Sequence, residues 1–191
     1  MTLREEVLDA SLASRLLTEH GKCEGQDQSA WSGDFPLPEP LVAFYRDVGP
    51  NDITIGGYGN PTFMPSLARL WEHQRGYRFH PTTSKRFPDW NADWIVVADM
   101  GADPYIYYEG RVLHAMHGKE KWTPESLFPD LNTMCAAFAV IGSVVKGAGL
   151  ELADDDGYIR PQYYERARDS LASILGDDFL GLRVLETAGW H

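Results

Sequence analysis

Apolar residues recur every three or four positions in several stretches of this chain, which is the spacing of helices that bury one face. Near the N-terminus, Leu8, Leu12 and Leu16 follow this spacing. Thr2 and Glu5 precede them with the separation of a capping box, in which each side chain binds the other residue's backbone N–H. The pattern predicts an amphipathic first helix that begins at this box.

Four later stretches show the same period and are bounded by residues that start or stop helices. Pro124 and Pro161 stand where proline favours the first helical position, and Thr123 is expected to cap the helix that Pro124 opens. The four helices are expected over residues 37–48, 66–75, 124–146 and 161–175.

Alternation with a period of two residues runs from Trp94 to Met116. Residues 94–100 are apolar on both faces, which is typical of a strand inside a sheet. Turn residues at 101–104 and again a few positions later divide the remainder, so the segment predicts a three-stranded antiparallel meander. We expect Trp94, at the start of its first strand, to anchor the core. A short strand is also expected at 53–55.

The composition favours one ordinary globular domain. The chain has 191 residues, of which 43% are hydrophobic and 24% charged, so a core can form without a metal or a disulfide. Its two cysteines, Cys23 and Cys135, form neither a disulfide framework nor the close pairs of a metal knuckle. The sequence therefore predicts no disulfide and no metal centre.

The charge balance restricts the partners. The 28 acidic residues outnumber the 17 Lys and Arg residues, which leaves a net charge of -11. Such a chain repels phosphate backbones and anionic lipids, so neither nucleic acid nor a membrane is expected as a partner. The charged residues Arg4, Glu5 and Glu6 stand where a secretion signal would be apolar, and no run of about 18 apolar residues occurs. A cytoplasmic location is expected.

Motifs for nucleophilic or metal chemistry fail on their spacing. Ser143 follows Gly142 directly within an apolar helical stretch, which does not match a nucleophile elbow. His114 and His117 are three apart on an expected strand, where side chains alternate, so they point to opposite faces. We therefore expect no catalytic residue, no metal ligand and no cofactor.

Two groups of carboxylates leave alternatives open. The acidic run 154–157 resembles part of a calcium loop, but that alignment places Leu152 and Tyr163 where carboxylates are required, so a solvated turn is the better interpretation. Asp99 and Asp103 flank a tight turn. They either form an acid and base pair or serve as hydrogen-bonding turn residues, and the second interpretation is favoured.

Between residues 37 and 131 the order of these features resembles the SUKH superfamily of Smi/Knr-type proteins. The family pattern combines a tryptophan, a short apolar strand, a turn with a Gly-Asp pair and an aromatic strand. Here Ala102 separates Gly101 from Asp103, which departs from that pattern. The residues that carry the resemblance are Leu37-Pro38, Phe44-Tyr45, the glycine-rich turn 56–60, the run from Trp94 to Tyr108, Val112, Phe128 and Leu131.

The resemblance implies a single α+β domain with a central, mainly antiparallel sheet flanked by helices. It also implies a role in binding other proteins. Bacterial members are commonly immunity proteins that neutralise a toxin, often a nuclease or a deaminase, and fungal members regulate cell-wall synthesis. The family shares no catalytic residues. In this chain we expect an N-terminal helix and connector (1–36), a SUKH-like core (37–149) and an acidic helical extension packed on the core (150–191).

Two functional hypotheses follow. The first is a protein-binding module, not an enzyme, that inhibits a basic toxin domain through acidic and aromatic residues of the meander. The second is a small-ligand-binding protein or an enzyme with a pocket in the same region. The first hypothesis uses Asp99, Asp103, Tyr105, Tyr107 and Glu109, and the second uses Trp94, Asp99, Asp103 and Tyr105.

Overall fold

The strands form one sheet in which each strand pairs with the next in the chain. In the computed structural model, which describes residues 8–119 and 121–190, this sheet has six strands and every pairing is antiparallel. The expected meander forms its centre, with β3 to β5. The strands are β1 (Ile53–Ile55), β2 (Thr62–Met64), β3 (Ile95–Met100), β4 (Asp103–Tyr108), β5 (Arg111–His114) and β6 (Glu125–Phe128).

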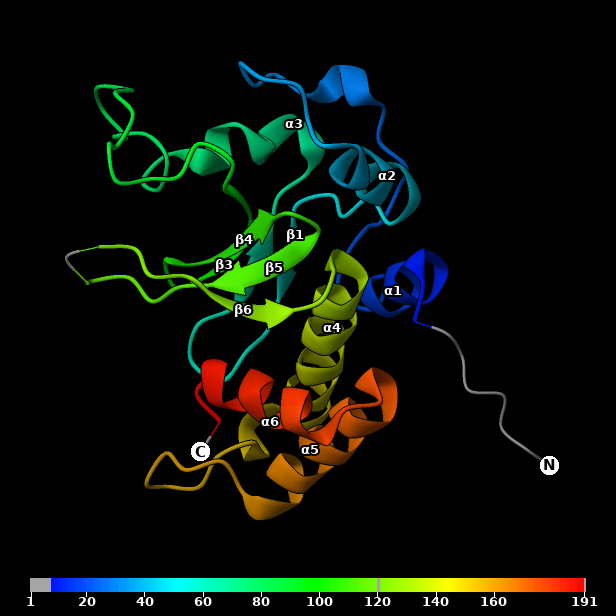
Figure 1. Cartoon of the computed structure of the whole chain (residues 1–191). Coiled ribbons are helices and arrows are strands. Elements are labelled where there is room, and N and C mark those ends of the chain that lie inside the picture. The colour runs from blue at the N-terminus through cyan, green and yellow to red at the C-terminus, as the bar shows by residue number, and fades with distance from the viewer. Residues whose placement is uncertain (1–7, 120, 191) are drawn as a thin grey trace.

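Helices lie on both sides of the sheet (Figure 1). This arrangement confirms the predicted α+β class with an antiparallel sheet flanked by helices in a single domain. Among the described residues the α-helices are α1 (Ala10–Leu17), α2 (Glu39–Asp47), α3 (Leu67–Leu70), α4 (Leu131–Ala148), α5 (Pro161–Leu175) and α6 (Asp178–Thr187).

The two faces of the sheet bury separate sets of side chains. On one face, Ile95, Ala98 and Tyr105 belong to the large core around α4. On the other, Val96 and Ile106 belong to a smaller cluster with tryptophan and tyrosine side chains. A bulge between Val96 and Ala98 shifts the register, so the alternation of β3 changes phase there.

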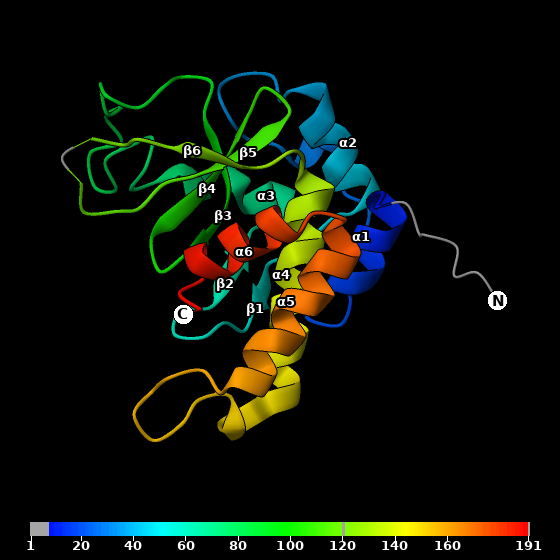
Figure 2. The ribbon, with the colours of Figure 1, turned by 60° about the horizontal axis from the view of Figure 1, so that its bottom comes forward.

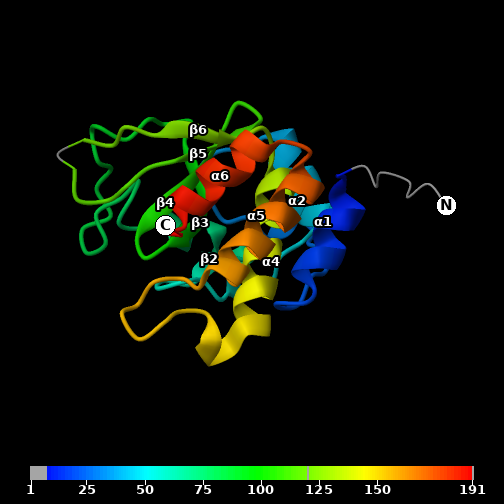
Figure 3. The same cartoon turned by 90° about the horizontal axis from the view of Figure 1, so that it is seen from below.

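Helix α4 is the central helix of the large core. It contacts α1 and α5, and Figures 2 and 3 show it between the sheet and α5, with α6 beside α5. Asp130 caps its N-terminus by accepting a hydrogen bond of 2.8 Å from the Thr133 N–H. With the following 3₁₀ turn, the segment Leu131–Glu151 is long and apolar enough to cross a membrane, but 61% of its apolar window is buried inside the molecule. It is the core helix of a soluble-like domain.

Some expected boundaries are wrong. Thr123 does not cap a helix, because the residues that follow pair with β5 as strand β6, and α4 begins seven residues later than Pro124. Strand β2 and helix α6 were not expected. The proposed capping box of Thr2 and Glu5 lies outside the described residues. Helix α1 is capped instead by Asp9, which accepts from the Leu12 N–H at 2.9 Å.

Candidate functional site

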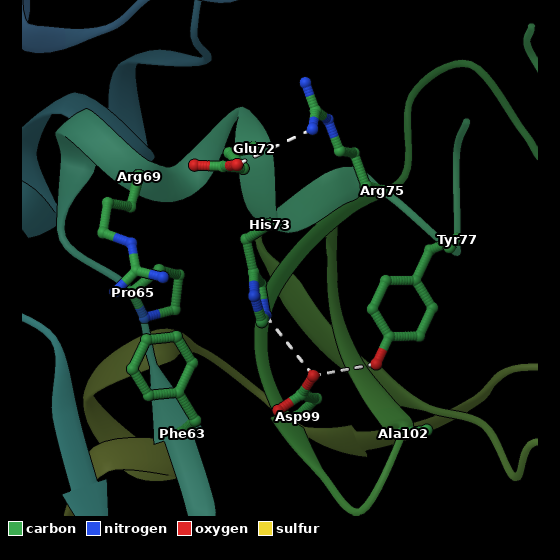
Figure 4. Close-up of a pocket in the computed structure, with 10 residues that line it drawn as sticks. Phe63, Pro65, Arg69, Glu72, His73, Arg75, Tyr77, Asp99 and Ala102 are labelled. Atoms are coloured by element: carbon green, nitrogen blue, oxygen red, sulfur yellow. Dashed lines mark hydrogen bonds and ion pairs between the residues drawn. The ribbon is translucent and has the colours of Figure 1, made fainter. Parts of the chain in front are cut away.

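A cavity of about 470 Å³ opens on the face of the sheet opposite α4 (Figure 4). Phe63 and Asp99 pair across β2 and β3 and form its floor. The helical segment of α3 and the 3₁₀ turn η2 (Glu72–Gln74) forms its other wall and contributes Arg69 and His73, and Tyr77 follows shortly after. Arg69 and Asp99, which are 30 positions apart in the sequence, therefore line the same cavity.

Gln74 holds the helical wall against the sheet. Its side chain is fully buried and donates to the carbonyls of Leu70 and Val96, at 2.8 and 2.9 Å. The same amide accepts the Val96 N–H at 2.9 Å. Because these bonds join η2 to β3 directly, they place the adjacent His73 and the nearby Tyr77 above Asp99.

Three polar side chains meet at the floor. The Tyr77 hydroxyl donates to Oδ2 of Asp99 at 2.9 Å. Nε2 of His73 lies 3.8 Å from the same oxygen, which is too long for a hydrogen bond. That nitrogen is buried and has no hydrogen-bond partner in the described part of the chain. The His73 ring instead packs against Phe63, with ring centroids 5.5 Å apart.

Burial sets the protonation of the two titrating rings. It lowers the pKa of His73 below the ordinary value, and the nearby Asp99 carboxylate only partly opposes this effect. His73 is therefore mostly neutral at pH 7. Burial, and next the charge of Asp99, raise the pKa of Tyr77, which stays a hydrogen-bond donor. On the cavity floor, the Asp99 carboxylate therefore faces a mostly neutral imidazole and a neutral phenol.

Two arginines stand at the rim. The Arg69 guanidinium lies 5.6 Å from the centroid of the Phe63 ring and 3.7 Å from the carboxylate of Asp52. The Arg75 guanidinium turns instead toward Glu72, also at 3.7 Å (Figure 4). Both ion pairs are longer than a charge-assisted hydrogen bond, so they hold their guanidinium groups loosely.

Of the residues predicted from the sequence, only Asp99 lies in this cavity. Asp103 lies opposite Met100, the neighbour of Asp99, so the two carboxylates point to opposite faces and form no acid and base pair. Oδ1 of Asp103 instead pairs with Nδ1 of His117 at 2.6 Å. Asp103 also accepts the His117 N–H, so its hydrogen bonds reach a residue 14 positions away, whereas the turn interpretation expected bonds within its own turn.

The two candidate tyrosines are buried, whereas Trp94 and Glu109 are not. Tyr105 and Tyr107 belong to the large core, so they support the sheet and offer no surface to a partner. Glu109 is exposed in the β4–β5 turn. Trp94 is only half-buried and packs edge-to-face on Trp90 in the smaller cluster, so it does not anchor the main core as expected.

The structure brings Ser143 close to a histidine that its sequence context did not indicate. Its Oγ lies 3.3 Å from Nε2 of His20 and donates to a carboxylate oxygen of Glu19 at 3.0 Å. Nε2 of His20 also lies 2.9 Å from the carbonyl of Ala139, which can only accept a hydrogen bond. Nε2 therefore carries the proton and cannot act as the base that a serine nucleophile needs.

A second surface of interest lies over α6. Phe179 and Leu182 are spaced to share one helix face and are 70% and 42% exposed. Met116, 57% exposed, lines a cavity of about 320 Å³ between α6 and the end of the sheet, together with Glu186. The Arg183 side chain joins α6 to the edge strand β6 by donating a hydrogen bond to the Ser126 carbonyl at 2.9 Å. We call Phe179 and Leu182, the two large exposed apolar side chains of α6, the α6 apolar surface.

Charged residues of both signs lie around α6, and Lys119 and Arg183 line the cavity beside Glu186. Asp178 and Glu186 lie on α6 itself, and Glu125 lies on β6, all three exposed. Residues 150–191 carry nine acidic and four basic side chains in the sequence, so the helical layer that contains α6 is acidic as a whole. Exposed apolar side chains on a helical layer with an excess of acidic residues suit a surface that binds a basic protein.

Comparisons with other proteins give no further assignment. No family model, curated protein or solved structure matches this chain. The SUKH resemblance therefore rests on the quoted motifs alone. Within residues 8–119 and 121–190, no group of three or more His, Cys, Asp or Glu side chains is placed to hold a metal ion.

Proposed function

We propose that this protein is a SUKH-like binding module that acts as an immunity protein and inhibits a basic toxin domain by stoichiometric binding, without turnover. The observation that carries the proposal is the α6 apolar surface, which lies on the acidic C-terminal helical layer. Two large exposed apolar side chains that share one helix face favour a protein interface over a solvent-facing role.

The net charge of -11 supports a basic partner. A nuclease or another toxin that acts on nucleic acid presents cations to phosphate, and an acidic inhibitor complements that surface. Such substrates lie inside the cell, so a cytoplasmic location belongs to the same proposal. Phe179 is the aromatic side chain best exposed to serve as an anchor among the described residues of α6.

The contacts assigned from the sequence change accordingly. Tyr105 and Tyr107 drop out because they are buried, and Asp99 faces the cavity on the other side of the sheet. Asp103 remains, because it lines the α6 cavity with Met116. Glu109 remains as an exposed acid of the meander.

The test is surface binding kinetics against the toxin domain encoded by the neighbouring gene. We expect a Kd of about 1 µM or tighter, and an association rate that falls as salt rises from about 50 to about 500 mM. Dissociation should change much less, because contacts within the formed interface are screened less.

Substitutions locate the interface. Phe179→Ser with Leu182→Ser should weaken binding by about thirtyfold or more, the cost of losing a hot spot. The matched control is Leu150→Ser, which changes a fully exposed leucine at the far end of α4 and should leave affinity unchanged. If the double variant and the Leu150→Ser control lost affinity equally, the α6 apolar surface would not be the interface. If the wild type did not bind the toxin domain at all, the proposed immunity role would be wrong.

A second candidate function, binding of a small molecule, is favoured by one specific observation. The cavity beside Asp99 combines a carboxylate, aromatic walls and a rim arginine in a single space. Its chemistry is independent of the α6 apolar surface.

A further inference from the structure

The cavity between α3 and the sheet contains opposite charges at two depths. Asp99 stands on the floor and Arg69 at the rim. Arg69 pairs with Asp52 outside the cavity lining, whereas Asp99 faces the mostly neutral His73 and has no ion pair with it. A negative and a positive group that face one cavity without neutralising each other define the charges of a ligand that would fit between them.

The floor suits an ammonium group. The Asp99 side chain is 24% exposed, and the Tyr77 hydroxyl is the hydrogen-bond donor that its carboxylate has in the described part of the chain. Its other oxygen is left to accept hydrogen bonds from a ligand. The rings of Phe63 and Tyr77 both line the cavity, and aromatic faces attract a cation that has been withdrawn from water. The neutral His73 does not repel one.

The rim suits a carboxylate. The Arg69 guanidinium is more than half exposed, and Figure 4 shows it above the Phe63 ring at one side of the cavity. Its distance of 3.7 Å to Asp52 leaves its donors free for shorter, charge-assisted bonds with an incoming carboxylate. Arg75 is not in that position, because its guanidinium points away from the floor toward Glu72.

We propose that this cavity binds a small unbranched zwitterion, an ω-amino acid whose ammonium group pairs with Asp99 and whose carboxylate pairs with Arg69. A zwitterion has no net charge, so the net charge of -11 on the protein does not repel it as it would repel a plain anion. A plain cation would meet Arg69 at the entrance. This binding does not depend on the proposed toxin partner.

The test is calorimetric titration with a series of probes that differ only in length: glycine, β-alanine, γ-aminobutyrate and 6-aminohexanoate. A longer member should bind with a Kd of about 1 mM or tighter, in the range expected for so few atoms. Two further probes, hexylamine and hexanoate, carry one charge each and should bind at least about tenfold more weakly, since each lacks one pairing. Equal binding of hexylamine and 6-aminohexanoate, or no binding of any zwitterion, would overturn the proposal.

Variants assign the two charges. Asp99→Asn and Arg69→Gln should each weaken binding of the best zwitterion by about tenfold or more, and Arg69→Gln should leave hexylamine unaffected or tighter. The matched controls are Asp103→Asn, on the opposite face of the sheet, and Arg168→Gln, an exposed arginine of α5 paired with Asp169. If the controls lose as much affinity as the cavity variants, binding is not in this cavity. Thermal melts of all four establish that each is folded.

Discussion

At the scale of single residues, the β3–β4 turn stores strain at an alanine. Gly101 and Ala102 connect the strands with φ of 61° and 77°, so both residues of this two-residue loop have left-handed backbone. An alanine in this region costs about 1–2 kcal/mol, whereas glycine adopts it freely but loses more chain entropy on folding. We expect Ala102→Gly to raise the free energy of unfolding by about 0.5–1 kcal/mol in urea melts.

The preceding position provides the contrast. A Cβ at Gly101 would lie 2.1 Å from Nδ2 of Asn60, so Gly101→Ala adds a steric clash to the strain of a positive φ. This variant should be less stable than the wild type. If both substitutions changed stability in the same direction, the strain assigned to Ala102 would be wrong.

His114 provides a pH-dependent contribution. It is half-buried against Tyr105, its Nε2 has no hydrogen-bond partner in the described residues, and burial lowers its pKa. A lowered pKa means that the folded state binds the proton less well than the unfolded state. The stability it contributes is therefore complete above about pH 6.5, the unfolded value, and is lost as pH falls toward the folded pKa.

The measurement is urea unfolding of wild type and His114→Gln at about pH 7, 6 and 5. The wild type should lose stability over this range, and the variant should lose less because one of the histidines with a lowered pKa is absent. His73, whose pKa burial also lowers, keeps part of the slope in both proteins. Identical slopes would show that His114 does not contribute.

At the scale of elements, the contact between η2 and β3 depends on one side chain. Gln74→Leu keeps the volume but removes the two donated bonds and the one accepted bond, and it leaves the Val96 N–H and carbonyl buried without this partner. We expect a loss of about 2–4 kcal/mol in unfolding free energy. Hydrogen exchange should show faster opening of η2 than of β4, and uniform behaviour of the two would contradict this link.

Two tryptophans can be compared for their share of the core. Trp190 follows α6 and is 1% exposed in the large core, whereas Trp94 is half-buried in the smaller cluster. Trp190→Ala should cost about 3–5 kcal/mol, and Trp94→Ala clearly less. Guanidinium melts of the two variants measure the difference. The reverse order would mean that the smaller cluster, and not the α6 layer, stabilises the fold.

The sequence predicted the elements with a strong local signal and missed those fixed by pairing. The meander has alternation and turns, so β3 to β5 were predicted. Strands β2 and β6 have only three and four residues, too short for a clear alternation. Pro124, just before β6, favours a helix by its local signal, but the residues after it pair with β5 instead. Helix α6 has apolar residues on its exposed face too, so its buried stripe is blurred.

The cavity was only partly predicted because it, too, depends on contacts between segments that are distant in the sequence. Asp99 was identified because it ends a clear strand. The bonds of Gln74 to Val96, which join segments 22 residues apart, hold the wall that carries His73 and Arg69 against the sheet. No local pattern in the sequence indicates that contact. The functional resemblance likewise concerned the meander, while Phe179 and Leu182 lie on α6, outside the segment that carries the resemblance.

At the scale of the whole molecule, charge opposes folding. Folding brings the acidic side chains closer together than they are in the unfolded chain, and with a net charge of -11 this adds repulsion to the folded state. Salt screens this repulsion, with a Debye length that falls from about 30 Å at 0.01 M to about 8 Å at 0.15 M. It also weakens surface ion pairs such as Arg86 with Asp34, but each of these is worth only about 0–1 kcal/mol.

Repulsion acts over the whole surface, whereas each surface ion pair contributes little. We therefore expect salt to stabilise the folded state more by screening the repulsion than it destabilises it by weakening the ion pairs. The melting temperature should rise by a few degrees, about 2–5 °C, between about 10 and 300 mM NaCl. Asp155→Lys with Asp156→Lys, two exposed positions of the acidic turn, should raise the melting temperature at low salt and flatten its salt dependence. Asp154 is left intact, since its carboxylate accepts the N–H groups of Asp156 and Tyr158. A melting temperature that falls with salt in the wild type would show that ion pairs outweigh repulsion.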